Sequence, residues 1–99
     1  MNFIEKFTEY CDSIINSKKI EIPNKTLPQT KREQEYKSSR NTMETHLKDT
    51  FFEEGKNIEE QAQRENKILT LEQLKEMQQI GDNKIKAFFD IADDQFSEL

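Results

Sequence analysis

The feature that most constrains this chain is a stripe of apolar residues at helical spacing along its middle. At about 100° per residue, the members of the stripe fall within an arc of about 100°. The stripe contains Tyr36, Met43, Leu47, Phe51, Ile58, Ala62 and Leu69. Tyr36, Leu47, Ile58 and Leu69 recur every eleven residues, which favours a nearly straight helix. The pattern therefore predicts one long central helix over residues 31–69.

Two further features refine this long helix. Thr30 and Glu33 have the spacing of a capping box, which marks a helix start. Gly55 lies inside the helix and costs about 1 kcal/mol relative to alanine there. A kink, if the helix has one, is therefore expected near residue 55.

The first residues of the chain predict a second helix over 3–16. Its apolar residues fall within an arc of about 140° at helical spacing. They are Phe3, Ile4, Phe7, Tyr10, Cys11, Ile14 and Ile15. Asn2, three residues before Glu5, is the expected N-cap. Residues 17–30 break the pattern, because Pro23 and Pro28 lack amide donors and favour extended neighbours. We expect an extended connector there, with Ile20 and Ile22 packed on the helices.

The last third of the chain predicts one or two helices. Thr70 and Gln73 form a capping box before the apolar positions of a helix over 71–80. Gly81, Asp82 and Asn83 are typical of a C-cap followed by an N-cap, with a last helix over 83–98. The alternative is a single bent helix over 71–98, because the apolar spacing continues through Gly81.

Composition supports an all-α fold. The 99 residues contain no valine, and glutamate, lysine and glutamine, which favour helices over strands, are frequent. We therefore expect a single helical domain over residues 1–99 with three or four helices. A narrow apolar stripe on a long helix buries best against another long helix, so we also expect a homodimer.

Several classes of protein are not expected from this composition. A single cysteine rules out an intrachain disulfide framework and fits a reducing cytoplasm. No apolar run reaches the roughly 18 residues of a membrane span, and no signal peptide is visible. The two glycines do not suffice for a phosphate-binding loop. We expect a cytoplasmic protein that acts away from the membrane.

Catalytic and metal sites are also not expected. His46 is the only histidine and has no evident partner for acid–base or metal chemistry. Cys11 lies among apolar positions and is expected to be a small core residue. Asp90, Asp93 and Asp94 lack the alternating ligands and glycine turn of a calcium loop, and a solvated acidic face is the simpler interpretation. We therefore expect no enzyme, no cofactor and no metal.

The charge is uneven and suggests two binding surfaces. Residues 49–99 carry a net charge of −7, and residues 18–48 carry +4. Phe52 and Ile91 lie off their apolar stripes, and an exposed apolar residue with a charged rim is typical of a protein interface. The predicted partner-binding residues are Asp90, Ile91, Asp94, Glu98 and Phe52. The residues of an alternative nucleic-acid surface are Lys18, Lys19, Lys31, Arg32, Lys37 and Arg40.

The favoured interpretation is a small acidic protein that binds a partner protein with a basic surface. It would act by occluding that surface. By analogy, inhibitors from phages and mobile elements and immunity proteins have this character. The alternative is a regulator associated with nucleic acid, which would bind phosphates through the basic segment 18–48.

Overall fold

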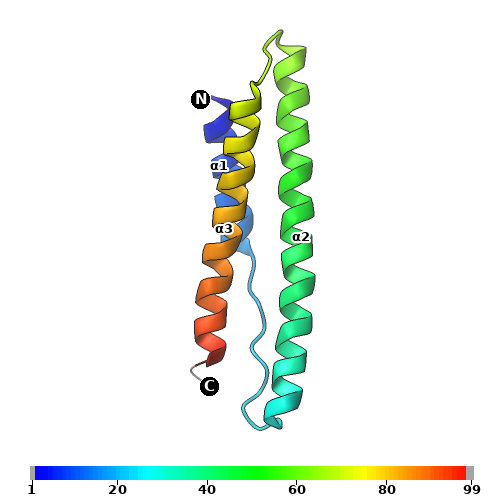
Figure 1. Cartoon of the computed structure of the whole chain (residues 1–99), viewed down its shortest axis with the longest axis vertical. Coiled ribbons are helices and arrows are strands. Elements are labelled where there is room, and N and C mark those ends of the chain that lie inside the picture. The colour runs from blue at the N-terminus through cyan, green and yellow to red at the C-terminus, as the bar shows by residue number, and fades with distance from the viewer. Residues whose placement is uncertain (1, 98–99) are drawn as a thin grey trace.

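The computed structural model describes residues 2–97 and shows three helices with no strand among them. The helices are α1 (Phe3–Ser17), α2 (Gln29–Arg64) and α3 (Leu71–Ser97). Figure 1 shows α2 running antiparallel to both α1 and α3, so that α1 and α3 are parallel to each other. The molecule is elongated, with extents of 57 × 21 × 17 Å. The prediction of an all-α fold with one long helix is confirmed.

Helix α1 begins where the sequence predicts. The Asn2 side chain accepts a hydrogen bond of 2.7 Å from the Glu5 amide, and its own amide group donates to the Glu5 carboxylate at 3.2 Å. This cap satisfies a donor that the first turn of a helix leaves free. Phe7 and Cys11 are the buried residues of α1, and they lie on its predicted apolar face.

The connector over residues 18–28 is free of helix and strand, as predicted, apart from a turn at 25–27. In Figure 1 it continues from the end of α1 to the start of α2 at the opposite end of the molecule. Ile20 is buried, and Ile22 packs against the core. The connector therefore covers the part of the bundle that the short α1 does not reach.

The predicted start of the long helix is wrong. Helix α2 begins at Gln29 directly after Pro28, whose side chain gives no capping hydrogen bond. Proline fixes φ near the helical value, and here Pro28 has φ −56° with extended ψ. Helical geometry therefore begins one residue before Thr30, which lies inside the first turn and cannot act as the cap.

The predicted end of the long helix is also wrong. Helix α2 ends at Arg64 rather than near residue 69. Asn66 has a φ of 60°, its amide donates to the Gln63 carbonyl at 3.0 Å, and the Lys67 amide donates to the Ala62 carbonyl at 2.8 Å. This pair of bonds is a Schellman motif, which ends helices at a left-handed residue, here asparagine. No break occurs at Gly55, and Figure 1 shows α2 as one unbroken helix.

The break predicted at Gly81–Asn83 is wrong, and the single-helix alternative over 71–98 describes α3 better. The start of α3 is as predicted: the Gln73 amide donates to Thr70 Oγ1 at 3.1 Å, and the Thr70 amide donates to the Gln73 side chain at 2.9 Å. The helix then continues through Gly81, which is buried. A Cβ atom at Gly81 would lie only 3.2 Å from Phe51 Cδ2. Glycine serves there to let α3 approach α2 closely.

The three helices share one hydrophobic core. The apolar stripe of α2 is covered within the same chain by α1 and α3, so it is not left for a second long helix. The core contains Phe7, Cys11, Ile20, Tyr36, Leu47, Phe51, Ile58, Ala62, Leu69, Met77, Ile85, Phe89 and Ala92. Within residues 2–97, no helix combines the length and the apolar character that crossing a membrane requires.

Substituting Gly81 with leucine should lower the free energy of unfolding by about 1–3 kcal/mol, the usual cost of overpacking a core. The added side chain meets Phe51 and Phe7, which lie 3.2 Å and 3.7 Å from the position of a Cβ atom. The matched control is Ala87→Leu on the exposed side of α3, which should change stability by less than about 0.5 kcal/mol. Urea unfolding followed by circular dichroism measures both. Equal effects in the two variants would contradict the close approach at Gly81.

Candidate partner-binding surfaces

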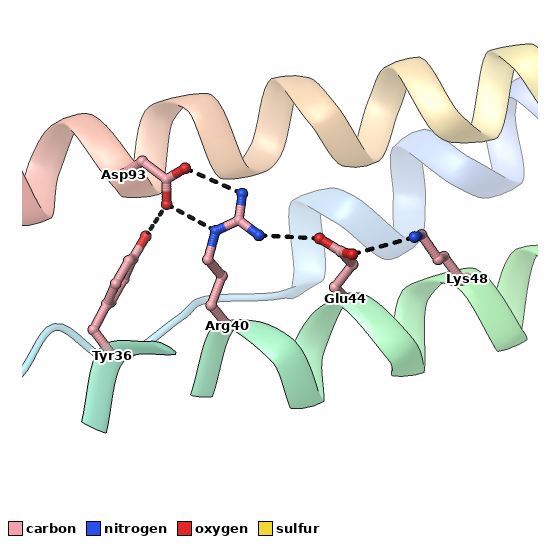
Figure 2. A network of polar contacts seen from close by, with 5 residues as sticks. All are labelled: Tyr36, Arg40, Glu44, Lys48 and Asp93. Carbon is pink, nitrogen blue, oxygen red and sulfur yellow. Dashed lines mark hydrogen bonds and ion pairs between the residues drawn. The ribbon is translucent and has the colours of Figure 1, made fainter. Parts of the chain in front are cut away.

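A chain of polar contacts joins α2 to α3 on one side of the molecule (Figure 2). Tyr36, Arg40, Glu44 and Lys48 recur every four residues along α2, so their side chains lie on one side of the helix. The Tyr36 hydroxyl donates to Asp93 Oδ1 at 2.6 Å. Arg40 donates to both carboxylate oxygens of Asp93 at 3.0 and 3.1 Å, and to Glu44 at 3.0 Å. Lys48 completes the chain with Glu44 at 3.2 Å.

Two aromatic rings of α3 pack against residues of this polar chain. The Tyr36 ring stacks on Phe96 with centroids 4.3 Å apart and planes within 5°. The Arg40 guanidinium lies over the Phe89 ring, 4.5 Å from its centroid. A guanidinium over an aromatic face gains electrostatic attraction and covers apolar surface with its stem. The contacts therefore hold the ends of α2 and α3 together in a defined register.

The contacts in the polar chain shift the pKa values of Asp93 and Tyr36. The hydrogen bonds from Arg40 hold the pKa of the Asp93 carboxyl below its usual range. Burial and the hydrogen bond to Asp93 raise the pKa of the Tyr36 hydroxyl well above 10.0. Asp93 is thus ionised and Tyr36 protonated at neutral pH. Each group already has its partner, so the arrangement is suited to structure rather than to proton transfer.

A double-mutant cycle on Arg40→Met and Asp93→Asn should give a coupling energy of about 0.5–1 kcal/mol at pH 7, the range of partly exposed ion pairs. Asp93 has a lowered pKa in the folded state, so its contribution is present above the unfolded pKa of about 4 and is lost as the pH falls through the folded value. Urea unfolding at pH 7 and pH 2.5 tests this. A coupling that is absent at pH 7, or that grows as the pH falls, would contradict the ion pair.

The predicted nucleic-acid residues do not form one basic face. Arg32 is buried, with its guanidinium 5.5 Å from the Phe96 ring centroid, and Arg40 is held by Asp93 and Glu44. The remaining residues are half-buried Lys18 and exposed Lys19, Lys31 and Lys37. Lys31 and Lys37 lie about 120° apart around α2. The burial of Arg32 and the pairing of Arg40 with Asp93 depend on how α2 and α3 pack together, and no local signal in the sequence predicts either.

The predicted acidic surface lies on the outer face of α3. Asp90, Ile91 and Asp94 are exposed, and 63% of Ile91 is accessible to solvent. Lys86 pairs with Asp90 at 3.1 Å. Glu98 lies outside the described residues. We call Asp90, Ile91 and Asp94 the outer face of α3, and it combines an apolar side chain with two carboxylates.

A groove separates α2 from α3 on the side away from α1. It consists of two adjacent cavities of about 580 and 280 Å³, which share Lys48, Asp82 and Ile85. We call the two cavities together the α2–α3 groove. Phe7 of α1 contributes to the floor of the larger cavity. The sequence pattern does not predict this groove, and its two glycines, Gly55 and Gly81, are the only local signal for it among the residues that line it.

Phe52 lies at the rim of the α2–α3 groove and is 69% exposed. Its ring faces the Lys56 ammonium at 5.4 Å. The prediction that Phe52 is exposed is confirmed, but the structure does not bring it together with Ile91. Ile91 lines neither cavity and points about 160° away from Phe89, which lines the smaller one. Phe52 and Ile91 therefore belong to two candidate surfaces, which meet at Asp90, because this residue of the outer face of α3 also lines the smaller cavity.

The two reactive side chains have the environments that the sequence predicts. His46 is exposed on α2. Cys11 is fully buried, and burial, followed by the charge of Asp12, raises the pKa of its thiol to about 12. A thiol in this state is a poor nucleophile. Within residues 2–97, no group of three or more His, Cys, Asp or Glu side chains is placed to hold a metal ion.

Comparisons of this chain with protein-family models, with curated proteins and with solved structures found no match.

Proposed function

We propose that this chain is a small binding protein that acts by occupying the surface of another protein, without catalysis. The observation that carries the proposal is the outer face of α3, where Ile91 is 63% exposed between the exposed acids Asp90 and Asp94. Apolar side chains of this kind supply contact energy, while charges at the rim set specificity and the rate of encounter.

The charge of the chain supports a partner with a basic surface. Residues 49–99 carry a net charge of −7, and such a field attracts a basic surface in a salt-dependent way. An inhibitor or regulator of the kind found in phages, mobile elements or immunity systems would work in this manner. We place its action in the cytoplasm, where its single thiol stays reduced.

We also propose that the chain forms a homodimer. The apolar stripe on α2 does not support this, because α1 and α3 of the same chain cover it. The support comes instead from Phe52, which is large, apolar and 69% exposed at the rim of the α2–α3 groove. Light scattering across a concentration series measures the oligomeric state.

Capture from the native cell tests the binding function. The full chain, immobilised and incubated with lysate, should retain a partner protein after nuclease treatment. A gel shift with generic duplex DNA or RNA tests the alternative, a regulator of nucleic acid, which should bind with a strong dependence on salt. Retention that disappears with nuclease, together with a salt-dependent shift, would overturn our proposal.

A further inference from the structure

We infer that the α2–α3 groove is the dimer interface and that Phe52 of each copy fills the groove of the other. This inference rests on the homodimer that we propose above, and its test measures self-association rather than capture of another protein. The groove is then occupied by a second copy of this chain rather than by a helix of another protein.

An exposed apolar side chain and a cavity that can hold such a side chain lie next to each other on the same surface. Phe52 is exposed on the rim of the larger cavity, and Gly55 and Gly81 line that cavity beside it. The cavity of about 580 Å³ has ample room for a phenyl ring, since about 150 Å³ is enough to bind benzene. A side chain at Gly55 would approach Phe7 and Met77 at 3.9 and 4.0 Å, so glycine leaves this part of the floor open.

The positions of Phe52 and the α2–α3 groove are compatible with the symmetry of a two-fold dimer. In a two-fold dimer, both copies contribute the same surface to the interface. If one residue of the first copy contacts a second residue of its partner, the reverse contact also forms, so the surface must be complementary to itself. A two-fold axis parallel to the helices places α2 of one copy opposite α3 of the other, at the same level along the bundle. Phe52 and the open floor at Gly55 lie at one level, because they line the same cavity. This operation therefore brings Phe52 of each copy to the groove of the other.

The charges that line the α2–α3 groove are complementary to those of a second copy. Lys48 on α2 and Asp82 on α3 line both cavities from opposite walls of the groove. The same two-fold axis brings Lys48 of one copy to Asp82 of the second copy, and the reverse, which gives two opposite-charge pairs. Among residues 2–97, Asp82 takes part in no ion pair within its own chain. Lys48 is more than half exposed, so its ammonium retains free donors beside its contact with Glu44.

The test uses the full chain and sedimentation equilibrium over a range of protein concentrations. Lys48→Glu alone and Asp82→Lys alone each replace two attractive pairs by two repulsive ones and should weaken the dimer at least tenfold. An equimolar mixture of the two variants should form a heterodimer close to wild-type affinity, because both of its pairs are again opposite in charge. The double variant should recover in the same way.

Two further variants complete the experiment. Phe52→Ser removes the apolar side chain at an exposed position and should also weaken the dimer at least tenfold, with an unchanged helical spectrum. Lys31→Glu combined with Asp94→Lys alters the same types of charge outside the groove and should leave the dimer unchanged. A dimer that Phe52→Ser and both charge variants leave intact lies on another surface and overturns the inference. A wild-type chain that stays monomeric, or a groove that instead takes up a helix of another protein, overturns it as well.

Discussion

Replacing Leu47 by aspartate is expected to unfold the chain. Leu47 lies at the centre of the α2 stripe and is completely buried. The substitution places a carboxylate there with no partner, which costs several kcal/mol, and it also removes the packing of the leucine. A small domain has a total stability of about 5–15 kcal/mol, and this one has a thin core. Far-UV circular dichroism should show loss of most of the helical signal at 25 °C.

Two controls separate burial from the charge itself. Leu47→Met keeps the volume and should cost less than about 1.5 kcal/mol. Thr45→Asp introduces the same carboxylate two residues earlier, at an exposed position of the same helix, and should leave the fold intact. A Leu47→Asp variant with a wild-type spectrum and a cooperative melt near the wild-type temperature would place Leu47 outside the core.

The adjacent residues Phe51 and Phe52 are expected to differ greatly in their contribution to stability. Phe51 is 4% exposed, meets the Phe7 ring edge to face at 6.4 Å, and packs against Gly81. Phe51→Ala should therefore lower the free energy of unfolding by about 3–5 kcal/mol. Phe52 is 69% exposed, and at protein concentrations low enough to keep the chain monomeric, Phe52→Ala should change it by less than about 0.5 kcal/mol.

The difference between Phe51→Ala and Phe52→Ala reports which side of α2 faces the core, because consecutive residues of a helix lie about 100° apart. Both variants delete the same atoms, so differences in side-chain chemistry cancel. Urea unfolding followed by circular dichroism gives the two values. Equal losses, or a larger loss at Phe52, would contradict the packing of α2 against α1 and α3.

Local signals explain most of what the sequence predicted correctly. The caps at Asn2 and Thr70 depend on residues three positions apart, and apolar spacing alone placed Phe7, Leu47 and Phe89 in the core. The end of α2 was also encoded locally, since Asn66 is one of the few residue types that adopt a positive φ readily. The apolar stripe continues to Leu69, however, and this competing signal predicts a longer helix.

Gly81 shows why other features could not be predicted. Glycine is typical both of a helix end and of a close helix contact, and only the position of Phe51 decides between them. The same holds for Asp93, which meets Tyr36 and Arg40 across more than fifty residues of sequence. Such contacts depend on the register in which α2 packs against α3. The α2–α3 groove depends on the same register. Exposed residues such as Phe52 and Ile91 were found because their spacing excludes them from the core.

The most direct test of the proposed binding function compares three immobilised forms of the chain as baits for the captured partner. The first is wild type, and the second carries Asp90→Lys, Asp94→Lys and Glu98→Lys. The third carries Glu53→Lys, Glu60→Lys and Glu65→Lys, which make the same change in net charge at exposed positions outside α3. Our account predicts that the second form loses at least tenfold in partner affinity, whereas the third retains affinity within about threefold, or roughly 0.7 kcal/mol. Equal affinity in the second and third forms would contradict it.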